Sequence, residues 1–287
     1  MSATGISRSA SDGLWMLTVN VGCAGPGDWV PRSRAMSEWI RRAIKVRQPA
    51  LIFAQEVTGE FLDAVRACGY DVVSDPSPRW KVRSALASHS DFRLDLLSEE
   101  DFPSLAYHGS YLAAAVWLGS PLGDVTVVSV HASPKHAEPA KYGWTCELPE
   151  ARLGGGDARY APKRLWDSDL VLQTLAAMAA SGRTFIAAGD FNESLNDDLD
   201  AEGVRRGTWG REYFDRMSAL GLSEIQMAAG LPELATYGSL QLDHFVWGLA
   251  DERPIPFAPV VELDLAWSSA SGLSDHVPLW LHLSNTE

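Results

Sequence analysis

Short apolar segments rich in β-branched and aromatic residues recur along the whole chain, and each is long enough for a single strand only. Runs of this kind favour buried strands, while a helical spacing of apolar residues marks some of the segments between them. The pattern therefore indicates a chain built on strands, with helices in some of the connections. The expected strands are 14–21, 50–57, 110–118, 125–132, 183–190, 243–248 and 276–283.

Helices are expected in four of the connections. Pro31 opens a segment in which Met36, Ile40 and Ile44 follow a helical spacing, so residues 31–48 are predicted to be helical. The other predicted helices are 58–68, 163–180 and 209–220. Residues 133–162 contain three consecutive glycines and several prolines, which indicates a long surface excursion rather than a linker between domains.

The composition fits a globular protein with a sizeable core. The chain has 287 residues, of which 46% are hydrophobic and 21% charged, enough for one large domain or two small ones. No repeat or low-complexity segment divides it, so residues 13–287 are expected to form one domain. Residues 1–12 are small and polar, and we expect them to be a flexible start.

Charge and cysteine usage restrict the partners and the compartment. A formal net charge of −13 argues against a large basic surface that binds nucleic acid non-specifically, although a local basic cleft or bound cations would still permit such a partner. Cys23, Cys68 and Cys146 are odd in number and widely spaced, which favours reduced cysteines in a cytoplasmic protein. No segment is apolar enough to predict a signal peptide or membrane anchor, and no protein partner is inferred.

Polar side chains occur at or beside the ends of the predicted strands. Taken singly, each has an ordinary explanation: Asn20 in a turn, Glu56 leading a helix, or His131 satisfied in the core. Together, they indicate a site at one rim of neighbouring sheets. The set is Asn20, Gln55, Glu56, His131, Asp190, Asn192, Asp243, His244, Asp275 and His276.

These side chains share a coherent chemistry. Carboxylate and amide oxygens suit Mg²⁺, with Mn²⁺ or Ca²⁺ as alternatives, whereas zinc prefers histidine and thiolate ligands. Histidines nearby supply proton transfer or positive charge near neutral pH. A hard cation beside imidazoles suits phosphoester hydrolysis, in which a polarised water attacks phosphorus and the developing negative charge must be neutralised.

Six segments in this order give the chain a resemblance to the endonuclease/exonuclease/phosphatase superfamily, which includes pancreatic-type deoxyribonucleases. The segments are "TVNVG", "FAQEV", "VVSVHASP", "AAGDFNES", "LDHFVWG" and "LSDHVPLW", and the resemblance spans about residues 14 to 283. It implies an α/β fold of four layers, an α/β/β/α sandwich with two mainly antiparallel sheets face to face. It also implies a metal-dependent phosphoester hydrolase.

Residue roles follow from the same resemblance. Glu56 resembles the principal metal carboxylate of the family, with Asn20 and Asp275 completing the metal environment. Asp190 resembles the residue that orients or deprotonates the attacking water, or binds a second metal, and Asn192 the amide that holds water and phosphate.

The histidines also match family positions. His276 resembles the histidine beside the scissile phosphate, acting as a base or as a charged clamp, and Asp243 the carboxylate that orients it. His131 resembles a second histidine, an acid for the leaving group or a phosphate contact. Residues 77–94 offer no glutamate to partner His131, and His244 is given a packing role.

The substrate is less constrained than the chemistry. Arg79 and Trp80 in "PRWKVR" and Trp144 in the long excursion are predicted to contact phosphate or stack on bases, which favours a nuclease acting on DNA or RNA. A phosphatase or phosphodiesterase for a soluble phosphate, or less favourably a lipid phosphate, would use the same metal machinery. An inactive protein that binds a phosphorylated ligand is disfavoured. Such a protein would be expected to have lost Glu56, Asp190, Asn192 or His276, and the chain contains all four.

Overall fold

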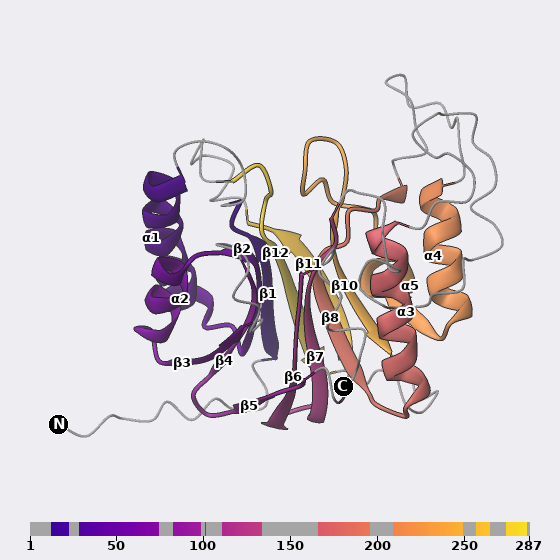
Figure 1. Cartoon of the computed structure of the whole chain (residues 1–287), viewed down its shortest axis with the longest axis horizontal. Coiled ribbons are helices and arrows are strands. Elements are labelled where there is room, and N and C mark those ends of the chain that lie inside the picture. The colour runs from indigo at the N-terminus through magenta and orange to yellow at the C-terminus, as the bar shows by residue number, and fades with distance from the viewer. Residues whose placement is uncertain are drawn as a thin grey trace.

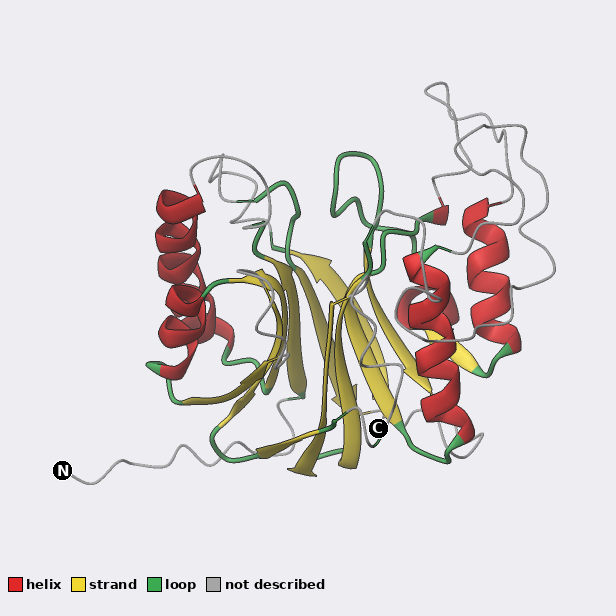
Figure 2. Ribbon diagram, viewed as in Figure 1, coloured by secondary structure: helices red, strands yellow, loops and turns green. Residues whose placement is uncertain are grey.

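Two sheets packed face to face form the centre of the protein in the computed structural model, with helices on both outer faces (Figure 1 and Figure 2). The structure describes residues 13–22, 29–74, 83–98, 101, 111–133, 166–195, 209–248, 257–264 and 274–285. The layers thus follow the order α/β/β/α, which confirms the fold predicted from the sequence. Residues 1–12 lie outside this description, so the flexible start and the single domain stay predictions.

The first sheet contains six strands in the order β11-β12-β1-β2-β4-β3. Strands β1 and β2 run parallel, and the other neighbours are antiparallel. The strands are β1 (Leu14–Asn20), β2 (Leu51–Val57), β3 (Tyr70–Ser74), β4 (Arg83–His89), β11 (Phe257–Leu263) and β12 (Leu279–Asn285).

The second sheet also contains six strands, in the order β5-β6-β7-β8-β10-β9. Only β7 and β8 run parallel among its described neighbours. The strands are β5 (Arg93–Leu96), β6 (Tyr111–Ser120), β7 (Gly123–His131), β8 (Phe185–Asp190), β9 (Leu222–Glu224) and β10 (Asp243–Gly248).

Each sheet has its own helical layer. Helices α1 (Trp29–Arg47) and α2 (Gly59–Arg66) pack on the first sheet through a core that includes Trp39, Phe61 and Trp280. Thr58 caps α2, because its hydroxyl accepts a hydrogen bond from the Phe61 amide. Helices α3 (Asp167–Ala180) and α4 (Trp209–Ala219) pack on the second sheet, and the short helix α5 (Ile225–Ala228) lies on the same side (Figure 1).

A third apolar layer fills the space between the two sheets. Phe53 of β2 and Phe245 of β10 meet edge to face there, with ring centroids 6.1 Å apart. Burying one such side chain contributes about 1.5–3 kcal/mol, so this layer holds the two sheets in a fixed relation. A site formed from both sheets therefore has a rigid support.

Most of the predicted elements are present, with shifted boundaries. The strand predicted at 276–283 begins only at Leu279, because Pro278 has no N–H for a ladder and His276 instead forms an isolated bridge with Tyr237. Two strands that were not predicted, β4 and β5, lie between residues 83 and 96. Small residues and buried serines fill β4, so its apolar signal is weak.

Within the described part of the chain, no helix combines the length and the apolar character needed to cross a bilayer.

Candidate active site

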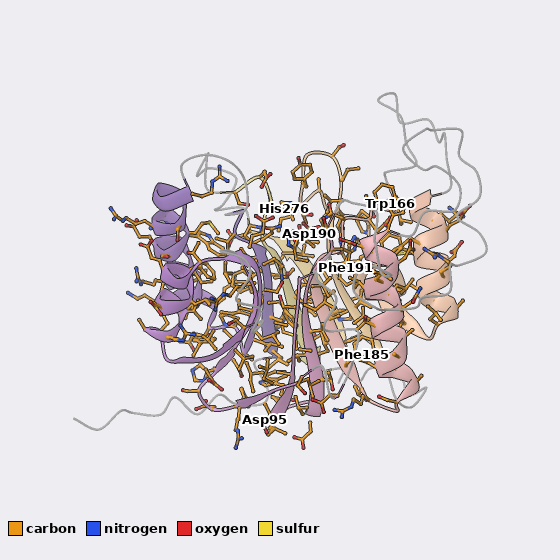
Figure 3. All side chains as sticks on the ribbon, in the orientation of Figure 1. Asp95, Trp166, Phe185, Asp190, Phe191 and His276 are labelled. Carbon is orange, nitrogen blue, oxygen red and sulfur yellow. The ribbon has the colours of Figure 1, made fainter. Side chains whose placement is uncertain are left out.

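Three predicted catalytic residues lie side by side at one end of the second sheet. Asp190 ends β8, and its Cα is the register partner of both His131 on β7 and Asp243 on β10. All three are buried. The sheet itself therefore sets the spacing of this row, and Figure 3 shows Asp190 and His276 together at the same end of the molecule.

Gly189 allows the strands to meet at this row. Its φ is +143°, and a Cβ there would lie 2.0 Å from the carbonyl oxygen of Val130 on the neighbouring strand. Any other residue would push β7 away from β8. The glycine in "AAGDFN" thus has a structural role that brings His131 next to Asp190.

The first sheet contributes Asn20 and Glu56. Asn20 ends β1 and pairs in register with Gln55 of β2. Its side-chain Nδ2 donates a hydrogen bond to Asp190 Oδ2 at 3.1 Å, which links the two sheets across the site. Glu56 follows with φ at 51°, where the β2–β4 register is irregular, so the local backbone turns its carboxylate away from a regular strand position.

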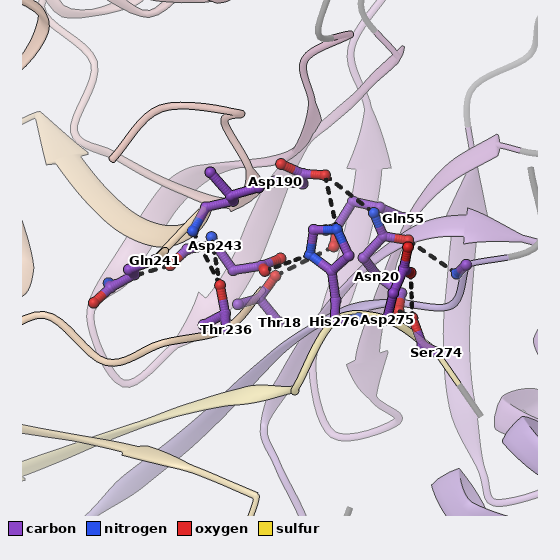
Figure 4. Close-up of polar contacts among 12 residues, drawn as sticks. Thr18, Asn20, Gln55, Asp190, Thr236, Gln241, Asp243, Ser274, Asp275 and His276 are labelled. Atoms are coloured by element: carbon purple, nitrogen blue, oxygen red, sulfur yellow. Dashed lines mark hydrogen bonds and ion pairs between the residues drawn. The ribbon is translucent and has the colours of Figure 1, made fainter. Parts of the chain in front are cut away.

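His276 lies between two carboxylates. Its Nδ1 is 2.8 Å from Asp243 Oδ2 and its Nε2 is 3.6 Å from Asp190 Oδ2 (Figure 4). Burial alone lowers the pKa of His276, but the charges of Asp243 and Asp190 outweigh it and raise the pKa to about 10. The imidazole therefore carries a positive charge at neutral pH.

His131 has the opposite character. Its Nε2 lies 3.3 Å from Glu56 Oε1 and 3.9 Å from Asp190 Oδ2. Burial nevertheless dominates and lowers the pKa of His131, so this imidazole is neutral near pH 7. Residues 77–94 contain no glutamate to partner His131, as noted from the sequence, and the carboxylate beside this histidine is instead Glu56 of the opposite sheet.

Asp190 is the centre of these contacts. Burial raises the pKa of its carboxyl group above the usual value, against the charges of the two histidines beside it. The Asn192 backbone N–H donates to its Oδ1 at 2.9 Å. Because burial outweighs these interactions and raises the pKa, the Asp190 carboxylate is suited to accepting a proton.

Asn192 sits in a strained turn directly after β8. Its φ is 53°, a conformation that asparagine tolerates better than most residues. The side-chain amide donates to the carbonyl oxygen of Ala132, just beyond the end of β7. Phe191 is fully buried and anchors the turn, which leaves Asn192 partly exposed at the rim.

Asp275 lies beside Asn20, on the exposed side of the site. The Ser274 hydroxyl donates to the Asn20 carbonyl oxygen at 2.9 Å, and Asp275 Oδ1 lies 3.4 Å from the Cβ position of Gly22. Since β1 lies between β12 and β2, Asn20 has Asp275 on one side and Glu56 on the other.

The donors present fit a hard divalent cation. They are carboxylate and amide oxygens. Among the described residues there is no group of three or more His, Cys, Asp or Glu side chains that could hold a metal ion, so the three ligands stay a prediction. Mg²⁺ is typically bound by one or two carboxylates and completes its shell with water and substrate phosphate. Glu56, Asn20 and Asp275 match that kind of partial protein shell better than they match a closed zinc site.

The structure does not describe the predicted substrate contacts. Arg79, Trp80 and Trp144 fall outside the described residues, so their roles in substrate binding stay predictions.

Tyr237 lies beside His276, a neighbour that was not predicted from the sequence. Its ring centroid lies 5.0 Å from that of His276 and the residue is 40% exposed. Its position in a loop between strands gave no periodic signal that would have singled it out.

Gln55 joins the two sheets through a side-chain contact that was not predicted. Its amide donates to the Ser129 hydroxyl at 3.0 Å, and that hydroxyl in turn donates to the Ala54 carbonyl. Gln55 thus ties β2 to β7 just below the site. The "FAQEV" motif contained this residue, but nothing in the sequence identified Ser129 as its partner.

The sequence model of the Endonuclease/Exonuclease/phosphatase family matches residues 17–276, so the chain belongs to this family. Its members act on phosphoric ester bonds, and the protein is accordingly a phosphoester hydrolase. A search of curated proteins found no match.

Solved structures with the same fold include several enzymes. Humanized TDP2 from D. rerio superposes with a TM-score of 0.60 at 13% identity, covering 96% of this chain and 100% of that one. An AP endonuclease from Archaeoglobus fulgidus gives 0.59 at 16%, with coverages of 93% and 98%. The human Nocturnin catalytic domain gives 0.57 at 18%, with 96% and 94%. At sequence identities this low, the superpositions show a shared fold and nothing further.

Proposed function

We propose that the protein is a nuclease that hydrolyses phosphodiester bonds by attack of an activated water. The main support is the row of His131, Asp190 and Asp243 across three neighbouring strands, with His276 held between the last two. This arrangement places a proton acceptor, Asp190, 3.6 Å from a cation, His276. Both are needed at a phosphate that gains negative charge during attack.

The proposed role of each side chain follows from its protonation state near neutral pH. Asp190 orients the attacking water and takes its proton, because burial raises the pKa of its carboxyl group. His276 holds the phosphate as a cation, since its pKa of about 10 makes it a poor base. Neutral His131 donates a hydrogen bond to the phosphate, and the Asn192 amide holds the water and the phosphate.

Glu56, Asn20 and Asp275 would hold a divalent cation, most favourably Mg²⁺, with Mn²⁺ or Ca²⁺ as alternatives. Such an ion supplies positive charge that neutralises the phosphate oxygens. Glu56 Oε1 also lies 3.3 Å from His131 Nε2, so the proposed metal ligand Glu56 is in direct contact with one of the two catalytic histidines.

A nucleic-acid substrate is favoured by a surface aromatic and by the structural relatives. Tyr237 is exposed beside His276, where a base next to the scissile phosphate can stack on its ring. A structure of D. rerio TDP2 in complex with a single-stranded DNA product has the same fold, with a TM-score of 0.58 at 13% identity. We also propose that Arg79, Trp80 and Trp144 contact the nucleic acid. The reduced cysteines expected from the sequence support a cytoplasmic location.

The decisive experiment is hydrolysis by the purified protein of a paired panel of substrates. Supercoiled DNA, single-stranded DNA and RNA are compared with bis-p-nitrophenyl phosphate and with phosphomonoesters, each with Mg²⁺ and with EDTA. We expect nucleic-acid cleavage that disappears with EDTA and in the Asp190→Ala variant. Activity confined to phosphomonoesters would replace the nuclease proposal by a phosphatase.

A further inference from the structure

His244 lies directly behind the catalytic row. It follows Asp243 on β10, is Cα partner of Gly189, and is only 2% exposed. The rings of Phe191 and Phe214 meet it edge to face, with centroids 6.0 and 5.1 Å away. These contacts agree with the packing role expected from the sequence, but packing alone does not account for its hydrogen bonds.

One ring nitrogen of His244 contacts two backbone carbonyls. Its Nε2 lies 2.9 Å from the carbonyl oxygen of Glu193 and 2.9 Å from that of Gln241. A carbonyl oxygen can only accept, so Nε2 carries a hydrogen that the two oxygens share. The geometry therefore fixes the protonation of this nitrogen.

The two carbonyls belong to the segments that present the catalytic residues. Glu193 follows Asn192 in the turn after β8, and Gln241 lies two residues before Asp243 at the start of β10. A single N–H therefore joins the backbone beside the water-holding amide to the backbone beside the carboxylate that orients His276. A shift of either segment would move a catalytic group.

The opposite edge of the imidazole is held by a buried carboxylate. His244 Nδ1 lies 3.5 Å from Glu224 Oε1 and 3.3 Å from Gln241 Nε2. Glu224 is 4% exposed, and its other oxygen accepts from the Met227 amide at 2.6 Å. Among the described residues, Oε1 has no hydrogen-bond partner, so His244 is the group that compensates its charge. Burial lowers the pKa of His244, but the neighbouring Glu224 carboxylate outweighs this effect and raises the pKa.

We propose that His244 is a positioning residue for hydrolysis: its shared Nε2–H hydrogen bond holds the Asn192 turn and the Asp243 strand start in register. Glu224 orients the ring for this task. The residue touches neither water nor phosphate, and the inference rests on the proposed function of the site.

The test replaces the donor while keeping the ring. His244→Phe preserves the aromatic contacts and removes the N–H, whereas His244→Gln retains an N–H donor. We expect kcat to fall about 10- to 100-fold in His244→Phe, with KM nearly unchanged and partial recovery in His244→Gln, because supporting contacts of a site typically have effects of this size. His282→Phe is the matched control: His282 stacks on Trp15 near the start of β1, away from Asn20, and its loss should leave kcat unchanged.

A double-mutant cycle separates positioning from general damage. If His244 acts through the Asn192 turn and Asp243, the Phe substitution should lower kcat much less when Asn192→Ala or Asp243→Asn is already present. Full additivity with both variants, or wild-type kcat in folded His244→Phe, would overturn the inference.

A measurement on the wild-type protein tests the inference even if His244→Phe does not fold or the wild type shows no nuclease activity. The ¹⁵N chemical shifts of His244 should show a protonated Nε2 throughout the pH range in which the protein is folded. An unprotonated Nε2 would refute the shared hydrogen bond, even if His244→Phe failed to fold. This readout needs no substrate, so it stands if the proposed nuclease activity fails in the wild type.

Discussion

The Nδ1 atom of His276 lies 2.8 Å from Oδ2 of Asp243, although 33 residues separate them in the chain. Thr236 fixes this pair, because its hydroxyl accepts from the Asp243 amide at 3.1 Å and its carbonyl accepts from the amide of Val277, next to His276. Asp243 Oδ1 is buried without a hydrogen-bond partner among the described residues. The carboxylate therefore depends on the imidazolium for compensation of its charge.

The pKa of His276 predicts how stability changes with pH. Its folded pKa of about 10 lies above the unfolded value of 6.5, so the folded state binds more protons between these values. Its contribution to the free energy of unfolding is complete below pH 6.5 and is lost as the pH rises to 10, with a slope of at most about 1.4 kcal/mol per pH unit. Urea unfolding at pH 6 to 10 in EDTA should show this decline, and His276→Gln should flatten it. An equal slope in both proteins would contradict the assignment.

The sequence predicted the rim of the site well because strands limit where their ends can lie. Asn20, His131, Asp190 and Asp243 each begin or end an apolar run, and such ends converge once two sheets pack. The pairing of His131 with Glu56 was not predictable, because it joins strands of different sheets that are distant in sequence. Local patterns contain no information on which face of one sheet opposes the other.

Residues between strands were harder to predict than those at strand ends. Tyr237 lies in the 231–242 loop, where no periodicity orders the side chains, and its bridge to His276 depends on tertiary packing. His244 followed the pattern of a buried strand residue, which concealed its contacts to Glu193 and Gln241. The Tyr237–His276 and His244–Glu193 contacts both depend on the path of a segment that is distant in the sequence.

Removing the central carboxylate should abolish catalysis without unfolding the protein. Asp190→Ala deletes the acceptor of the water proton, and we expect kcat to fall by about 10²–10⁴-fold, the usual contribution of a general base. Asp95→Ala is a suitable control, because Asp95 lies at the opposite end of the molecule (Figure 3). Circular dichroism should show both variants folded, and an Asp190→Ala enzyme with normal turnover would exclude Asp190 from the mechanism.

Neutralising Glu56 should separate metal binding from the rest of the chemistry. Glu56→Gln keeps the shape of the side chain but removes its charge, so activity should require about 10-fold or more Mg²⁺ for half-saturation. Glu60→Gln, an exposed position in the first turn of α2, provides the matched change of charge. Titration of activity against Mg²⁺ measures the difference, and coinciding curves for Glu56→Gln and wild type would argue against the ligand assignment.

Tyr237 should affect nucleic acid and small substrates differently. Its ring is 40% exposed and tilted by 42° against that of His276, so a base can stack on it while the phosphate reaches the histidine. Stacking of one base on an aromatic side chain is worth about 1–3 kcal/mol, so Tyr237→Ala should raise KM for single-stranded DNA by roughly 5- to 150-fold. Bis-p-nitrophenyl phosphate has no base, and its kcat/KM should change much less. Tyr237→Phe keeps the ring and should resemble the wild type on DNA. Equal losses on both substrates would instead indicate that Tyr237 supports His276, because only a disturbed catalytic group affects every phosphodiester alike.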